Sequence, residues 1–195
     1  MTGNETFTRL VALACHDLRT PLATVFGFAR TLSRSDALDE TSSRYVEMIE
    51  SASEQMGELL DELSVAARIE AGRYAPTAVE VDTAELARAA AERLGEERVS
   101  VSGAGGRVSV DREATERAVS ALAQCALRHG GLDEVWVEAM GSELTVRPIT
   151  PSSAPVVLGE DLRDLGAAVA VRLVRALGGS VELEGETLRI ALPAG

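Results

Sequence analysis

The stretch that decides the fold is residues 7–32, which read FTRLVALACHDLRTPLATVFGFARTL. Its apolar residues recur at intervals of three and four, at Phe7, Leu10, Val11, Ala14, Leu18, Leu22, Val25, Ala29 and Leu32. This spacing predicts a long amphipathic helix. His16 lies off the stripe and is expected to face solvent, while Pro21 lacks an N–H and is expected to bend or loosen the helix. The side chains one to three turns from His16 are mostly small: Ala12, Arg19, Thr20, Ala23 and Gly27.

A second helical stripe follows a polar break. It comprises Tyr45, Met48, Ile49, Ala52, Met56, Leu59, Leu63, Ala66 and Ile69. Ser35, Asp36 and residues 39–43 supply candidate N-caps, and Gly72 is typical of a helix C-terminus. Two long helices joined by a short turn form an antiparallel hairpin, which cannot cover both stripes by itself. Residues 1–75 therefore predict a helical-hairpin domain that forms a dimeric four-helix bundle from two copies of the chain.

Residues 76–195 have a mixed pattern and predict a second, α/β domain. Helices are expected at 83–94, 112–129 and 165–177, and strands at 79–81, 99–102, 107–110, 134–140, 143–147, 181–184 and 187–192. Residues 99–102 and 107–110 are expected to form a hairpin around Gly103–Gly106, and 134–140 and 143–147 a second hairpin around Gly141–Ser142. Residues 148–159 are expected to be irregular. Helices interleaved with hairpins favour an α+β sandwich, a mixed sheet with helices on one face.

Composition excludes several classes of function. The chain has 195 residues and a net charge of −12, without a basic cluster, so it is a poor candidate for binding nucleic acid or an anionic membrane. No apolar run approaches the roughly 20 residues that span a bilayer, and residues 1–8 do not resemble a signal peptide. We therefore expect a cytoplasmic protein with no membrane partner, in which Cys15 is a small core residue. Only about six residues precede the first helix, which favours a relay component over a receptor.

The string from His16 to Leu22, HDLRTPL, resembles the H-box of two-component histidine kinases. The resemblance implies that His16 carries a phosphoryl group, that Asp17 polarises the imidazole and accepts its proton, and that Thr20 can orient a water molecule. It also implies that the partner is a response-regulator receiver domain, which brings the acceptor aspartate and the magnesium ion. The residues expected to contact that partner are Ala12, Arg19, Ala23 and Gly27.

Residues 76–195 are similar to the kinase ATP-binding domain, but they depart from its pattern. The helix at 118–131 resembles the family's asparagine helix, and the two expected asparagines fall on Ala121 and Cys125. The chain's one asparagine is Asn4. After Val146 the expected adenine-reading acid and its glycine are absent. The first glycine of the last phosphate turn, which precedes Gly166, is replaced by Asp164, whose carboxylate is expected to cap the helix and repel phosphate.

These departures predict that the chain itself binds no nucleotide and no metal. The hypothesis is a homodimeric histidine phosphotransfer protein on a degenerate kinase frame, which relays phosphoryl groups between receiver aspartates through His16. The alternatives are a sensor histidine kinase core, a pseudokinase or phosphatase acting on a response regulator, and a binding module without phosphoryl chemistry. His129 is expected at a helix end without a catalytic role, and Trp136 in the core or at a surface contact.

Overall fold

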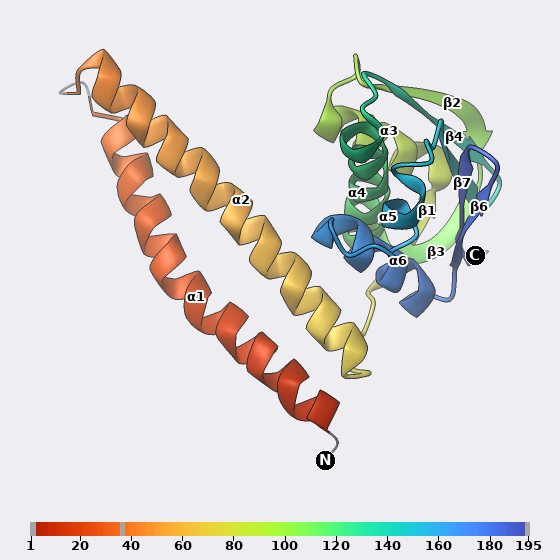
Figure 1. Ribbon diagram of the computed structural model, residues 1–195, viewed down its shortest axis with the longest axis horizontal. Coiled ribbons are helices and arrows are strands. Elements are labelled where there is room, and N and C mark those ends of the chain that lie inside the picture. Colours follow the sequence, from red (N-terminus) through yellow and green to blue (C-terminus); the bar gives the residue numbers. More distant parts are fainter. Residues whose placement is uncertain (1–2, 36–37, 194–195) are drawn as a thin grey trace. The chain divides into compact units, whose positions relative to one another are not determined.

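The computed structural model describes residues 3–35 and 38–193, and the chain divides into two compact units, Met1–Gly72 and Arg73–Gly195. The first unit is a hairpin of two long helices, α1 (Gly3–Ser33) and α2 (Glu40–Glu70), which lie side by side (Figure 1). Helix α1 is continuous through Pro21. No helix within the described ranges is long and apolar enough to cross a bilayer.

The ends of α2 follow the chemistry of its sequence. The Asp39 carboxylate accepts a hydrogen bond from the Ser42 N–H at 2.7 Å, which satisfies one of the free N–H groups of the first turn. At the other end Gly72 has a φ of +63°, the left-handed conformation that glycine adopts at little cost. Of the other candidate caps, Asp36 lies outside the described residues.

The buried side chains of the hairpin lie mainly on one face of each helix. They are Thr8, Cys15 and Ala29 on α1, and Val46, Ser53, Leu60 and Ala67 on α2. Val65 is also buried but lies on another side of α2. Cys15 is 2% exposed, so its prediction as a small core residue is confirmed. A second set of large apolar side chains remains exposed: Phe7, Leu10, Leu13, Leu18, Val25, Phe28, Leu32, Tyr45, Met48, Ile49, Met56 and Leu59.

The second unit is a layer of helices on a mixed sheet (Figure 1). Its elements are β1 (Ala78–Asp82), α3 (Thr83–Leu94), β2 (Val99–Gly105), β3 (Arg107–Asp111), α4 (Arg112–Gly130), β4 (Val135–Met140), β5 (Glu143–Arg147), α5 (Ala154–Val157), α6 (Leu165–Ala176), β6 (Ser180–Glu184) and β7 (Thr187–Ala191). The five-stranded sheet has the order β2-β4-β5-β7-β6, in which β2 and β4 are parallel and the other neighbours antiparallel. This architecture confirms the predicted α+β class.

The core of this unit lies between the sheet and helices α3, α4 and α6. Alternate residues of β4 show the pattern: Val135, Val137 and Ala139 are fully buried, while Trp136 is 42% exposed on the other face. The helices contribute buried leucine, valine and alanine side chains such as Leu86, Leu122 and Val174. Because aromatic residues are scarce, the core is built from many contacts between small aliphatic side chains.

The predicted hairpin of residues 99–102 and 107–110 is wrong. Strand β2 pairs with β4 in parallel, while β3 pairs with β1 in a separate two-stranded antiparallel sheet. The glycines between them serve close backbone approach: a Cβ on Gly106 would lie 2.6 Å from the Cα of Gly141, and one on Gly103 would collide with the carbonyl oxygen of Ala139. The second predicted hairpin, β4–β5, is confirmed.

The segment at 148–159 is also more ordered than expected, because it contains the short helix α5. Pro155 stands in the first turn of α5, where its missing N–H costs no hydrogen bond. The Ser153 hydroxyl is buried and accepts a hydrogen bond from the Thr150 N–H at 3.1 Å. This fold brings the chain from β5 back across the end of α4 and on to α6.

Candidate functional site

His16 is an exposed residue near the middle of α1, as its place off the apolar stripe predicts. At about 100° per residue, it lies roughly 120–180° around the helix axis from the exposed apolar residues Leu18, Val25 and Phe28. The imidazole is therefore outside the α1–α2 contact and on the side of the helix opposite Leu18 and Val25, with Leu13, three positions earlier, as its one large apolar neighbour in the exposed set. This position suits a nucleophile that another protein must reach.

The surroundings of His16 are open. Ala23 and Gly27 are exposed, and a Cβ built on Gly27 meets nothing within 4 Å. Asp17 and Thr20 are exposed as well, and the Thr20 carbonyl accepts a hydrogen bond from the Thr24 hydroxyl at 3.1 Å. The roles assigned to these side chains stay predictions.

Two of the residues expected to contact a partner lie differently from the rest. Ala12 is half-buried, and the Arg19 guanidinium forms an ion pair with Asp61 on α2. Sequence reasoning did not find this pair, because the two residues are 42 positions apart and their contact depends on how the helices pair. The ion pair draws the guanidinium toward α2, which leaves the small residues as the open part of the His16 surface.

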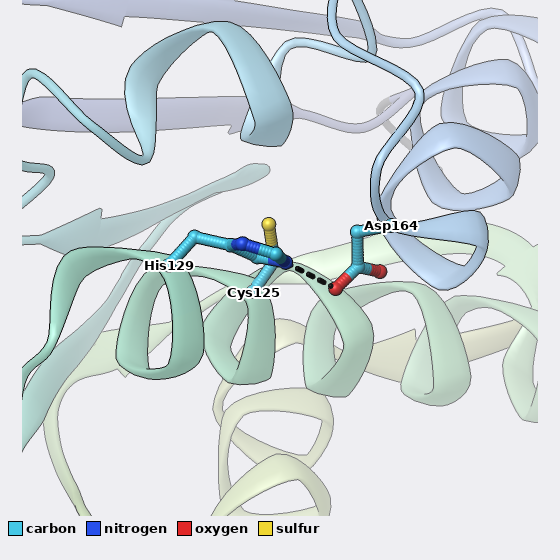
Figure 2. Close-up of side chains that lie close together, drawn as sticks. All are labelled: Cys125, His129 and Asp164. Atoms are coloured by element: carbon cyan, nitrogen blue, oxygen red, sulfur yellow. Dashed lines mark hydrogen bonds and ion pairs between the residues drawn. The ribbon is translucent and has the colours of Figure 1, made fainter.

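In the second unit, Cys125, His129 and Asp164 form a compact cluster (Figure 2). Cys125 and His129 lie on successive turns of α4, and Asp164 immediately precedes α6. The Nε2 atom of His129 lies 3.1 Å from Oδ2 of Asp164. Cys125 is fully buried, Asp164 is 8% exposed and His129 is half-buried. The cluster therefore connects the end of α4 with the beginning of α6.

Asp164 is the N-cap of α6, as the sequence predicts. Its Oδ1 atom accepts a hydrogen bond from the Ala167 N–H at 3.0 Å, and the guanidinium of Arg128 lies 3.5 Å from Oδ2. Gly166 lies in the first turn of α6 and is half-buried. One of the free N–H groups in the first turn of α6 is therefore already bonded to the carboxylate that caps the helix.

Cys125 is a neutral thiol at ordinary pH. Burial raises the pKa of its thiol to about 12, and the negative charge of Asp164 acts in the same direction. Ala121, the other position where the family resemblance places an asparagine, is half-buried, and the amide side chain of Gln124 is exposed. This face of α4 thus presents a methyl group and a thiol at the two positions.

Sequence reasoning did not predict the contact between His129 and Asp164. The available signal was the four-residue spacing of Cys125 and His129, which places them on one face of α4. Asp164 joins them through tertiary structure, across 35 positions of sequence. The sequence does not distinguish a core from a surface position for Trp136; the structure places it at the surface, beside a hollow lined by Arg147, Pro148, Glu186 and Thr187.

Comparison with known proteins gives consistent similarities for both units. The family model of the His Kinase A (phospho-acceptor) domain matches residues 8–72. Sensor protein DivL of Caulobacter vibrioides is 31% identical over 78 residues, which are 40% of this chain and 10% of DivL.

Two solved structures share the fold over nearly the whole chain. Full-length ShkA in complex with AMPPNP has a TM-score of 0.68 at 21% identity, covering 96% of this chain and 47% of ShkA. The histidine kinase AdeS of Acinetobacter baumannii has a TM-score of 0.55 at 16% identity, covering 91% of this chain and 98% of the AdeS structure. The chain thus spans about a tenth of DivL and less than half of ShkA.

Proposed function

Because the chain is two-component histidine kinase-like, with a phospho-acceptor hairpin followed by an ATPase-like domain, we propose that it is a histidine phosphotransfer protein. His16 takes a phosphoryl group from one response-regulator receiver domain and passes it to the aspartate of another, without ATP. One combination of features carries the proposal: an exposed imidazole at His16 and, in the ATPase-like domain, a buried thiol and a capping carboxylate where amide oxygens and a glycine are expected.

The transfer step balances with the groups available. A neutral ring nitrogen of His16 attacks the phosphorus of the aspartyl phosphate, and the bond from phosphorus to the aspartate oxygen breaks, so that the aspartate leaves as a carboxylate. The proton on the other ring nitrogen passes to Asp17. Such a step depends mainly on in-line positioning and charge stabilisation, for which the receiver domain supplies the magnesium ion. The small side chains of Ala23 and Gly27 leave room for it to approach.

Independence from ATP is supported by the chemistry of α4 and α6. Magnesium prefers oxygen ligands, whereas Ala121 and Cys125 offer a methyl group and a neutral thiol. A helix N-terminus suits phosphate when its N–H groups are free, but at α6 the carboxylate of Asp164 already accepts one of them. Glu160 and Asp161 add negative charge just before this end.

The proposed active form is a homodimer. On α1 and on α2 the exposed apolar stripe lies beside the face buried in the hairpin, so each helix has two adjacent apolar sides. A four-helix bundle from two copies covers both sides. The proposed partners are receiver domains, and the net charge of −12 argues against nucleic acid as a partner. The cytoplasm is the proposed compartment, because two buried free thiols suit a reducing environment better than a disulfide-forming one.

Two other functions have specific support. The fold similarity to ShkA in complex with AMPPNP favours a kinase core, in which the ATPase-like domain phosphorylates His16. The exposed hydroxyl of Thr20 favours a phosphatase that hydrolyses a receiver's aspartyl phosphate. These activities differ in the source of the phosphate and in its fate.

A phosphotransfer assay separates the three. Receiver domains carrying labelled phosphate are mixed with the chain, and label is expected on the wild-type protein and on His129→Ala but not on His16→Ala. The two variants are matched because the chain has two histidines. Label taken directly from ATP, or a clear rise in melting temperature with ATP and magnesium, would support the kinase core instead. Release of inorganic phosphate without phosphohistidine would support the phosphatase.

A further inference from the structure

The cluster in Figure 2 combines a sulfur, an imidazole nitrogen and a carboxylate oxygen, each from a different residue type that binds transition metals. The three donor atoms all lie within 4.8 Å of one another. We propose that Cys125, His129 and Asp164 bind a zinc ion. This inference goes beyond the proposed function and replaces the sequence-based expectation that the chain binds no metal. The proposed function uses Cys125 and Asp164 only to argue against a nucleotide, and the transfer step at His16 does not involve them.

The donor set selects the class of ion. Zinc is bound tetrahedrally by cysteine, histidine and aspartate, whereas magnesium and calcium require several oxygen ligands. A thiolate, a carboxylate and a neutral imidazole carry two negative charges together and so neutralise one Zn²⁺, which favours the ion in a largely buried site. The thiol of Cys125 gives up its proton to solvent on binding, Nε2 of His129 binds as a lone-pair donor, and water completes the fourth position.

The distances require a small adjustment. At the usual bond lengths to zinc, tetrahedral N, O and S donors are about 3.3–3.6 Å apart. The Nε2–Oδ2 pair is already at 3.1 Å, so the two atoms need to separate by only a few tenths of an ångström. The sulfur lies within 4.8 Å of both other donors, so it has to come nearer by no more than about 1 Å.

The surroundings hold the donors in place. The Ala167 N–H donates to Oδ1 of Asp164, which leaves Oδ2 directed toward His129. The Ser152 hydroxyl donates to the main-chain carbonyl of His129 at 2.9 Å and so holds the backbone at the end of α4 rather than the imidazole. Such outer contacts orient metal ligands. Arg128 opposes the ion, because its guanidinium is 3.5 Å from Oδ2; its side chain is 60% exposed and can turn into solvent.

The test is a titration of the metal-free full chain with Co²⁺, a spectroscopic substitute for zinc. One equivalent is expected to produce a thiolate-to-cobalt charge-transfer band and the strong visible bands of a tetrahedral ion, and Zn²⁺ is expected to abolish both. Zinc should also raise the melting temperature. Cys125→Ala should lose the charge-transfer band. His129→Ala should lower the affinity for the metal by at least about 10- to 100-fold, because loss of a residue that only supports a metal ligand already has an effect of that size.

Matched controls locate the site. Cys15→Ala removes the other buried cysteine and is expected to leave the bands unchanged, as is His16→Ala, which separates this test from the phosphotransfer assay. Circular dichroism establishes that each variant is folded. Asp164→Asn is a second ligand variant, and its amide oxygen can still cap the helix. A folded wild-type chain without the cobalt bands overturns the proposal. So does a charge-transfer band that survives in Cys125→Ala or disappears in Cys15→Ala.

Discussion

At the scale of single residues, burial decides which of the chain's few reactive groups can do chemistry. The chain has two histidines, and they are placed in opposite ways. His16 is exposed on a long helix, whereas His129 is half-buried and bonded to Asp164. Their surroundings, rather than their residue type, leave the first accessible to another molecule and make the second part of an internal cluster.

The raised pKa of Cys125 predicts a dependence of stability on alkaline pH in the metal-free protein. Because the folded thiol has a pKa of about 12 and the ordinary value is 9.0, the unfolded chain loses this proton first as pH rises. The stabilisation is complete below about pH 9 and is lost between pH 9 and 12. The free energy of unfolding should fall by up to about 1.4 kcal/mol per pH unit in that window.

Urea denaturation at pH 8 and pH 10, with a chelator present, measures this effect. The informative quantity is the difference between wild type and Cys125→Ala, because other groups titrate equally in both. The variant is expected to lose less stability between the two pH values than the wild type. An identical loss in both proteins would contradict the neutral buried thiol.

At the scale of elements, the sequence predicts the helices and their caps, but it predicts only part of the strand pairing. The spacing of apolar residues predicted α1, α2, α3, α4 and α6, because a helix is fixed by neighbours within a few residues. The β4–β5 hairpin was predicted for the same reason. The pairing of β2 with β4 was missed, because it joins segments separated by a whole helix.

The same limit applies to the candidate site. The local string around His16 predicted an exposed histidine with small neighbours, since both follow from position on one helix. The ion pair of Arg19 with Asp61 and the contact of His129 with Asp164 depend on which helices pack together, and no local pattern encodes that choice.

Glycine in β2 provides a test of the corrected topology. Gly103 has a φ of +97°, and a Cβ there would collide with the backbone of Ala139 in β4. Gly103→Ala should therefore cost about 3 kcal/mol or more, from strain and collision together. Gly131→Ala is the matched control: its φ is +63° but its surroundings are open, so only about 1–2 kcal/mol is expected. Equal losses in urea denaturation would argue against the close packing of β2 on β4.

Gly27 tests how the surface of α1 is used. It is an exposed position inside a helix with open space around it, so Gly27→Ala should stabilise the hairpin by about 0.5–1 kcal/mol. If the small residue is needed for approach to His16, larger substitutions such as Gly27→Leu should slow phosphotransfer several-fold while α1 remains helical. Thermal denaturation and the receiver assay measure the two effects. Unchanged transfer with Gly27→Leu would exclude this position from the docking surface.

At the scale of the whole molecule, the two units are stabilised differently. The unit from Arg73 to Gly195 has a closed core between its sheet and helices, with many fully buried aliphatic residues. Among the side chains that the structure describes, the hairpin buries few large ones and exposes twelve large apolar ones. Under the proposed function, this exposed apolar surface is covered by a second copy of the chain, and the hairpin is stable in water only in the dimer.

This difference predicts two unfolding transitions with distinct concentration dependence. The transition of the hairpin should shift to higher temperature as protein concentration rises, because dimerisation and folding are coupled there, whereas that of residues 73–195 should not move. Phe28→Glu places a charge on the exposed stripe of α1 and should produce monomers by light scattering and weaken the first transition. Leu162→Glu is the matched control, because Leu162 lies in the other unit and is 68% exposed, compared with 66% for Phe28. It should leave the dimer intact. Dimers that persist in Phe28→Glu, or a hairpin transition independent of concentration, would show that the stripe is not the dimer interface and that the hairpin is stable by itself.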